Sequence, residues 1–195
     1  MSAHSAHFSN IFPHETSRCS DIAAAILDQG GNAMDAAVAA TICLGVVGPS
    51  SSGLGGGCFI LGRTNTSDVL FVDSREEAPL GATENMYDSH PTASIWGGLA
   101  VAVPAELRGL YQSYQAQGGL VPWADLITPS VALAEEYVIS EHLGVHIQKM
   151  STVIEADKEL FKDIRALLTH ADGTYKIGIV LLGYVCYGLG SFACQ

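Results

Sequence analysis

The chain has 195 residues, which is enough for one domain and at most two. With 48% hydrophobic and 15% charged residues it can bury a core, so intrinsic disorder is not expected. The formal net charge is −11 and no basic stripe is present, which excludes nucleic acid as an expected partner because phosphate contacts would lack their electrostatic driving force.

Residues 1–17 are expected to form a flexible polar tail. No basic segment is followed there by an apolar run, so this stretch is not a signal peptide. Its histidines, His4, His7 and His14, fit such a tail better than a metal site. Across the whole chain, the five cysteines are too scattered for a disulfide-dense scaffold, and no C-x-x-C pair supports a zinc site.

Two helices are predicted next. Apolar spacing predicts the first over residues 20–27, and Gly30–Gly31 ends it. Asn32 is expected to cap the second, over residues 33–47, with Asp35 placed favourably at its amino end. Because this second helix is almost wholly Ala, Val, Ile and Leu, we expect a central helix that is packed on both sides.

A glycine-rich loop at residues 50–57 then leads into a predicted β-hairpin with strands Cys58–Leu61 and Val69–Val72. The loop is not a P-loop, because Cys58 follows its last glycine, and it precedes a strand where a dinucleotide motif would precede a helix. We therefore interpret its glycines as backbone packing. Asn65 in the predicted turn begins a glycosylation sequon, which matters only in the secretory pathway.

Arg75 lies just past the second predicted strand. A rigid scaffold at this point would present its planar guanidinium to a carboxylate, such as that of a substrate. Spacing alone favours the alternative, in which Asp73, Glu76 or Glu77 neutralises Arg75 in a surface pair.

Beyond the hairpin, residues 81–94 predict an irregular connection and Leu99–Val103 predicts a short buried strand. Pro104 is expected at the first position of a helix. One face of that helix would carry the apolar and aromatic side chains Leu107, Leu110, Tyr111 and Tyr114.

Two further helices are expected. Thr128–Pro129 should open one that runs to about Tyr137, and Ser140 should cap the next. His142 and His146 have the spacing of paired metal ligands, but no third ligand and no H-E-x-x-H glutamate accompany them. We therefore expect neither a metal site nor a cofactor.

From about residue 171 the chain forms an apolar tail. Ile177–Cys194 carries no charge and meets the minimum length for a membrane span. A membrane span is one interpretation of this tail. The other, which we favour, is the aberrant end of a truncated or mis-spliced reading frame.

A set of short segments occurs in a fixed order: Gly30–Ala39, Gly45–Val47, Ser51–Gly57, Asp73–Pro79, Ala102–Leu110, Leu120–Trp123 and Pro129–Ala134. Together they resemble the γ-glutamyltransferase family (γ-glutamyl transpeptidase, glutathione hydrolase). The resemblance covers about Arg18–Gly144 and is specific only when the segments are taken jointly.

The resemblance implies an α/β (α+β) fold, namely part of the αββα sandwich of an N-terminal-nucleophile hydrolase, cut short within the large subunit. Family precursors cleave themselves, and the new N-terminal threonine of the small subunit attacks γ-glutamyl amides such as glutathione. The implied partners are therefore a γ-glutamyl compound and a small subunit. The implied location is the cell surface, the extracellular space or the vacuole.

By the same resemblance, Arg75 matches the family arginine that binds the α-carboxylate of the glutamyl group. Cys19 and Cys43 match a pair that forms a disulfide in animal members, with two buried free thiols as the alternative.

No threonine, Thr169 and Thr174 included, matches the surroundings of the nucleophile. We therefore expect no catalytic residue here and no activity from this chain alone. Residues 18–170 are the family-like part, and 171–195 resemble nothing in the family. A non-catalytic large-subunit mimic, which binds a small subunit or is anchored by its C-terminal tail, is the alternative.

Overall fold

The structure is a computed structural model, and it describes residues 17–63, 68–135, 137–176 and 179–180. The chain forms two compact units, one built from the sequence up to Gly53 and from Gly118 onward, the other from Leu54–Gln117. Helices and strands are both present, so the architecture is α+β, as the sequence predicts.

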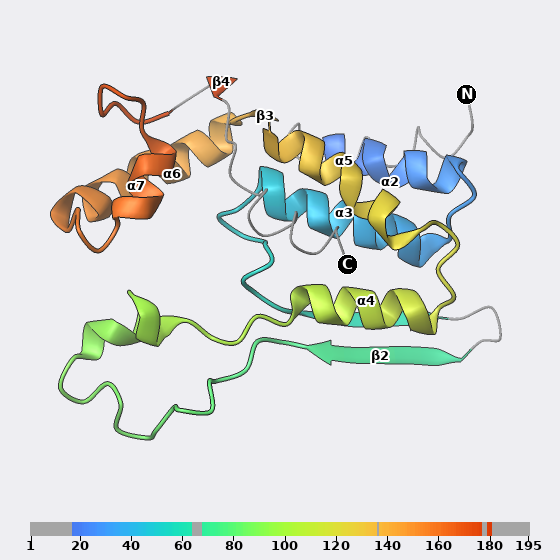
Figure 1. The fold of residues 1–195 in the computed structure, drawn as a ribbon, viewed down its shortest axis with the longest axis horizontal. Helices are drawn as coiled ribbons and strands as arrows, with labels where there is room; N and C mark the ends of the chain where they lie inside the picture. The colour runs from blue at the N-terminus through green and yellow to red at the C-terminus, as the bar shows by residue number, and fades with distance from the viewer. Residues whose placement is uncertain (1–16, 64–67, 136, 177–178, 181–195) are drawn as a thin grey trace. The chain divides into compact units, whose positions relative to one another are not determined.

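Three helices form the core of the first unit, which we call the helical unit (Figure 1). They are α2 (Ser17–Asp28), α3 (Ala33–Val47) and α5 (Trp123–Glu135), and α3 contacts both of the others. Each helix contributes side chains that are almost fully buried, among them Ile26, Val38, Ile42, Leu126 and Ile127. The predicted central helix that packs on two sides is therefore confirmed as α3.

The amino end of α3 is fixed by the predicted cap and by one contact that was not predicted. Asn32 Oδ1 accepts the backbone N–H of Asp35 at 3.0 Å, and Asp35 Oδ2 accepts that of Asn32 at 2.9 Å. The same Asp35 oxygen also accepts the N–H groups of Leu120 and Val121, at 3.0 and 3.3 Å. Because Asp35 is fully buried, its carboxylate ties α3 to the segment that leads into α5.

Helix α5 begins earlier than predicted, because Pro129 lies inside it and does not open it. Proline removes one backbone hydrogen bond, at a cost of about 3 kcal/mol in a helix interior. Leu126 and Ile127 precede Pro129 and are fully buried, which offsets that cost. Thr128 Oγ1 donates a hydrogen bond to the carbonyl of Ala124 at 2.9 Å.

The rest of the helical unit contains α6 (Glu141–Ala156), α7 (Lys162–Leu168) and the short antiparallel pair β3 (Tyr137–Val138) and β4 (Ile179–Val180). Ser140 caps α6 as predicted, since its Oγ accepts the N–H of Leu143 at 3.1 Å. Near the end of α6, Glu155 accepts hydrogen bonds from Arg165 Nε of α7 at 2.8 Å and from the Tyr175 hydroxyl at 3.1 Å.

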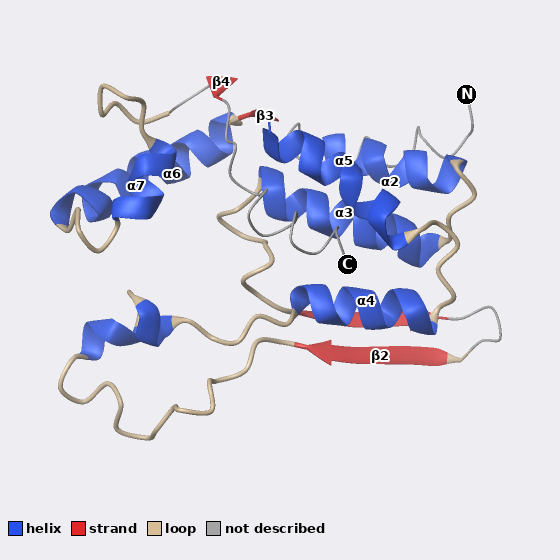
Figure 2. Cartoon of the chain, in the orientation of Figure 1, coloured by secondary structure: helices blue, strands red, loops and turns tan. Residues whose placement is uncertain are grey.

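The second unit, which we call the hairpin unit, is a β-hairpin with one helix against it (Figure 2). Strands β1 (Cys58–Arg63) and β2 (Val69–Ser74) pair antiparallel, with Cys58 opposite Ser74 and Arg63 opposite Val69. Helix α4 (Glu106–Ala116) contacts both strands. The predicted hairpin is confirmed, and each strand extends beyond its predicted end.

The predicted strand at Leu99–Val103 is wrong. Leu99 belongs to a short 3-10 helix, η2 (Gly98–Ala100), which follows η1 (Pro91–Ser94). Val101 and Val103 are exposed, and Val103 pairs with Glu77 through an isolated bridge. A short apolar run becomes a strand only where a neighbouring strand offers hydrogen bonds along its length.

Helix α4 also departs from its prediction. Pro104 precedes the helix, which starts at Glu106. The buried positions are Glu106, Gly109, Leu110 and Ser113, so of the predicted face only Leu110 is fully buried. Gly109 is required on this face because α4 lies very close to β2, where a Cβ on Gly109 would overlap the side chain of Ser74.

Some expectations concern residues outside the described part of the chain. These are residues 1–16 with their histidines, the sequon at Asn65, and the apolar segment Ile177–Cys194 apart from the backbone of β4. Among the residues that the structure describes, every helix is too short or too polar to cross a bilayer.

Candidate functional site

The candidate site is built around Arg75, and the residue before it anchors it to the hairpin unit. Ser74 ends β2 and is buried, and its Oγ donates a hydrogen bond to the Ala105 carbonyl at 2.5 Å. The backbone N–H of Arg75 donates to Asp73 Oδ1 at 3.1 Å. The backbone that carries the guanidinium is therefore held by both a strand and the start of α4.

The glycine-rich loop passes directly beside this backbone. The carbonyl of Gly56 accepts the N–H groups of Ala105 and Glu106, at 3.0 and 3.1 Å. A Cβ on Gly57 would lie 2.6 Å from both the backbone N and Oε2 of Glu76. Only glycine permits so close an approach, which supports the packing interpretation of this loop.

The guanidinium of Arg75 lies against the glycine loop and is half exposed. Its Nη1 donates to the Gly57 carbonyl at 3.1 Å, and its Nη2 pairs with Glu76 Oε1 at 2.7 Å, leaving the side chain 50% accessible. The surface pair that spacing favours is therefore present, with Glu76 as the partner. A guanidinium has five N–H donors, so this geometry still allows it to bind an incoming carboxylate.

Two groups near Arg75, one buried and one half-buried, were not singled out from the sequence. Glu106 at the start of α4 is only 4% exposed, and Cys58 at the start of β1 is half-buried. Burial and then the Glu76 carboxylate raise the pKa of Glu106. Burial and then Glu106 raise the pKa of the Cys58 thiol, while Arg75 lowers it. The sequence signal for Glu106 was its spacing with Gly109 and Ser113 on one helix face.

The arrangement can hold a carboxylate, but the described residues supply no nucleophile and base pair beside it. Cys58 is the nearest thiol, and its raised pKa keeps it protonated and unreactive at neutral pH.

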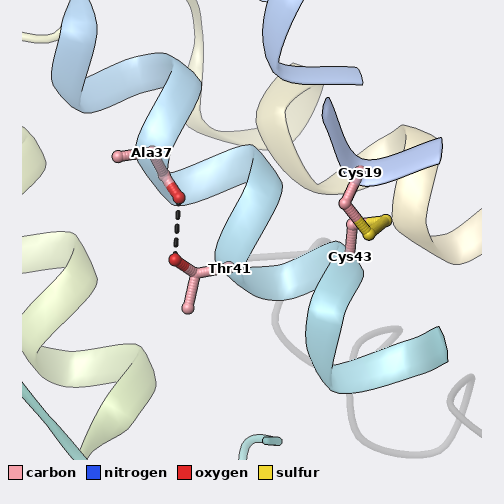
Figure 3. The surroundings of a disulfide bond; sticks show 4 residues. All are labelled: Cys19, Ala37, Thr41 and Cys43. Atoms are coloured by element: carbon pink, nitrogen blue, oxygen red, sulfur yellow. Dashed lines mark hydrogen bonds between the residues drawn. A yellow bond between two sulfur atoms is a disulfide. The ribbon is translucent and has the colours of Figure 1, made fainter. Parts of the chain in front are cut away.

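Cys19 of α2 and Cys43 of α3, both buried, belong to the helical unit. Figure 3 shows their sulfur atoms joined in a disulfide, with the Cα atoms 5.4 Å apart. Within α3, two residues before Cys43, Thr41 Oγ1 donates to the Ala37 carbonyl at 2.8 Å. The disulfide links two helices that already pack against each other, so its expected role is structural.

His142 and His146 lie on α6 with their ring centroids 4.6 Å apart, in an edge-to-face arrangement. No group of three or more His, Cys, Asp or Glu side chains within the described ranges is placed to hold a metal ion. The structure gives no support to a metal role for this pair.

Comparison with known proteins places these features in a wider context. The family model described as gamma-glutamyltranspeptidase matches residues 19–182. Glutathione hydrolase 2 of Arabidopsis thaliana is 46% identical over 144 residues, which cover 73% of this chain and 25% of that protein. Glutathione hydrolase proenzyme 2 of Schizosaccharomyces pombe is 43% identical over 118 residues, covering 60% of this chain and 19% of that protein.

Solved structures agree with these relatives. A gamma-glutamyltranspeptidase from Helicobacter pylori superposes with a TM-score of 0.83 at 26% identity, over 94% of this chain and 53% of that chain. A gamma-glutamyltranspeptidase from Pseudomonas nitroreducens, complexed with L-DON, gives 0.78 at 28% identity over the same shares. The matched residues span about a quarter or less of the length of the two glutathione hydrolases named above.

Proposed function

Because the chain belongs to the gamma-glutamyltranspeptidase family and corresponds to the N-terminal part of its large subunit, we propose that it contributes to a glutathione hydrolase site in which Arg75 binds the α-carboxylate of the γ-glutamyl group. The observation that carries this proposal is the placement of Arg75. Its guanidinium is half exposed, yet it is held on the glycine loop by the Gly57 carbonyl and Glu76. A fixed planar fork of this kind suits bidentate carboxylate recognition.

Arg75 would act by fixing the substrate before the chemical step. With its α-carboxylate held, the γ-amide carbonyl has a defined position for attack by a threonine hydroxyl, whose proton passes to that threonine's own α-amine. The amine of the leaving group then departs with a proton, and water or an acceptor amine releases the glutamyl group from the threonine ester. We assign the threonine to the part of a family-length protein outside these residues.

The hairpin unit offers a surface for that other part. Phe59 and Phe71 stack with ring centroids 6.1 Å apart and, with Leu61 and Val69, leave one face of the hairpin exposed and apolar. We define these four side chains as the open hairpin face. Helix α4 packs on the same two strands, so the open hairpin face is where a further layer would bury the sheet. This supports a role in subunit assembly.

Replacing Arg75 tests the proposal. In enzyme assembled from this chain and the complementary part of a family-length protein, Arg75→Ala should raise KM for a γ-glutamyl anilide by roughly 10- to 100-fold, since a hydrogen-bonded charge pair contributes about 1.5–3 kcal/mol. Arg108→Ala removes the same charge from an exposed position on α4 and is the control. An Arg75→Ala enzyme with the KM of the control would remove Arg75 from the substrate site.

The separate chain provides a second comparison. We expect it to release no product from the anilide, because the attacking threonine must come from elsewhere. Turnover that Arg75→Ala abolishes would contradict this expectation.

A further inference from the structure

Two glutamates flank the loop that holds Arg75, and each has one buried oxygen that accepts no hydrogen bond from any described residue. These atoms are Glu76 Oε2 and Glu106 Oε1. Glu76 Oε2 points at Gly57, where a Cβ would lie 2.6 Å from it. The backbone N–H of Glu106, like that of Ala105, donates a hydrogen bond to the Gly56 carbonyl, at 3.1 Å. The backbone of Glu106 thus lies beside Gly56, and the two carboxyl groups are close enough for the charge of Glu76 to act on Glu106.

Two carboxylates cannot hydrogen-bond to each other, because each oxygen is only an acceptor. A carboxyl group that keeps its proton becomes a donor, and pairs of neighbouring carboxyl groups commonly retain one proton between them. Arg75 supplies one positive charge and pairs with Glu76 Oε1, which balances one of the two negative charges. Protonation of the second carboxyl group removes the other negative charge, and the resulting O–H donor can satisfy both buried oxygens with one hydrogen bond.

We propose that Glu106 is a positioning residue for Arg75: it keeps a proton shared with Glu76, and this hydrogen bond holds the Glu76 carboxylate against the guanidinium. The chain of contacts runs from Glu106 through Glu76 to Arg75, and Glu106 itself does not touch the substrate. The role for substrate binding rests on the proposed function, whereas the shared proton does not.

The charged and titratable surroundings agree with the assignment. Burial and the Glu76 carboxylate both raise the pKa of Glu106, which favours its protonated form. The facing groups from the packed elements are Cys58 at the start of β1 and Arg75 and Glu76 beyond the end of β2. Cys58 is neutral at neutral pH because its own pKa is raised. Glu76 is therefore the negative charge that favours the protonated form of Glu106.

The proton is tested by nuclear magnetic resonance on the full chain with carbon-13 in the glutamate carboxyl groups. We expect Glu106 to titrate at higher pH than the exposed Glu77 in the same spectrum, and Glu76→Gln to lower the midpoint of Glu106. Glu77→Gln is the matched control and should leave that midpoint unchanged. Coincident midpoints for Glu106 and Glu77, or no response to Glu76→Gln, would overturn the inference.

The positioning role is tested by KM in the assembled enzyme. Glu106→Leu removes the donor and should raise KM for a γ-glutamyl anilide by roughly tenfold, whereas Glu106→Gln keeps an N–H donor and should restore KM to within about threefold. Equal KM values for the two variants would overturn the positioning role. If Arg75→Ala leaves KM unchanged, the proposed function fails, and the titration still decides whether the proton is shared.

Discussion

Gly57 lies where the glycine loop, the end of β2 and the Glu76 side chain meet, and it leaves no room for a methyl group. Around Gly55, in the same loop, the Cβ position is open. The two glycines therefore separate the effect of crowding beneath Arg75 from the general effect of replacing a loop glycine.

We predict that Gly57→Ala lowers the free energy of unfolding by about 1–3 kcal/mol, because the new methyl group must displace Glu76 or the backbone of β2. Gly55→Ala should change it by no more than about 0.5 kcal/mol. Denaturant unfolding of the two variants measures the difference. Equal losses in both would mean that close packing at Gly57 does not hold the site together.

The sequence identifies Arg75 and includes Glu76 among its candidate partners, but it does not identify the Gly57 carbonyl or Glu106. A charged residue just past a strand can be recognised from the strand pattern, and the family resemblance gives it a role. Glu106 was hidden because it begins a helix, where an acidic residue is expected for electrostatic reasons alone. Its burial follows from how closely α4 lies on β2, which depends on contacts between residues far apart in the chain.

Among the elements, α2 and α3 depend on each other through packing and through the Cys19–Cys43 disulfide. The two cysteines are separated by 24 positions in the sequence, for which the loop-entropy model predicts a stabilisation of about 3.5 kcal/mol. We predict that Cys19→Ser lowers the free energy of unfolding by about this amount under oxidising conditions, and that Cys58→Ser has a smaller effect. If a reducing agent destabilises wild type and Cys19→Ser equally, the disulfide is not the cause.

Helices α6 and α7 are linked by the carboxylate of Glu155, which pairs with Arg165. Hydrogen bonds from Lys158 and Arg165 lower the pKa of Glu155 to about 2. A carboxyl group whose pKa falls on folding stabilises the folded state above its unfolded pKa, and this contribution is lost as the pH falls toward 2. We predict that α7 loosens between pH 4.5 and 2 in wild type.

Hydrogen exchange of the α7 amides measures this loosening. Glu155→Gln should remove the pH dependence and leave α7 loose at neutral pH, while Glu84→Gln, at an exposed position in the hairpin unit, is the control. A pH dependence that survives in Glu155→Gln would assign the effect to another group.

The helices show where local sequence information is sufficient. Asn32 and Ser140 cap α3 and α6 as predicted, because a cap is a contact between residues two or three apart. The helix start predicted at Pro129 is wrong, because the burial of Leu126 and Ile127 overrides the local preference of proline for a helix start. The strand predicted at Leu99–Val103 is also wrong, because a strand needs a neighbouring strand along its whole length and only Val103 forms a bridge.

In the molecule as a whole, the open hairpin face is an apolar surface that is not covered by the rest of the hairpin unit. Phe59, Leu61, Val69 and Phe71 are each more than half exposed on one side of a hairpin whose two strands have six residues each. Contiguous apolar surface of this kind marks an interface or an aggregation-prone region. We assign it to assembly with the rest of a family-length protein.

We therefore predict that the separate chain is poorly soluble and that Phe59→Ser combined with Phe71→Ser increases its soluble fraction. The same double substitution should abolish assembly when the complementary part is co-expressed. Leu80→Ser removes an exposed apolar side chain outside the hairpin and serves as the control. Co-purification at wild-type level by the double variant would show that assembly uses another surface.

Recognition of an α-carboxylate by Arg75 can be tested directly by comparing two substrates that differ only at that group. KM is measured in the assembled enzyme, with wild-type Arg75 and with Arg75→Ala, for a γ-glutamyl anilide and for its analogue with an α-carboxamide. Our account predicts that the substitution raises KM for the carboxylate substrate by roughly 10- to 100-fold and leaves KM for the carboxamide nearly unchanged. An equal rise for both substrates would show that Arg75 does not bind the carboxylate.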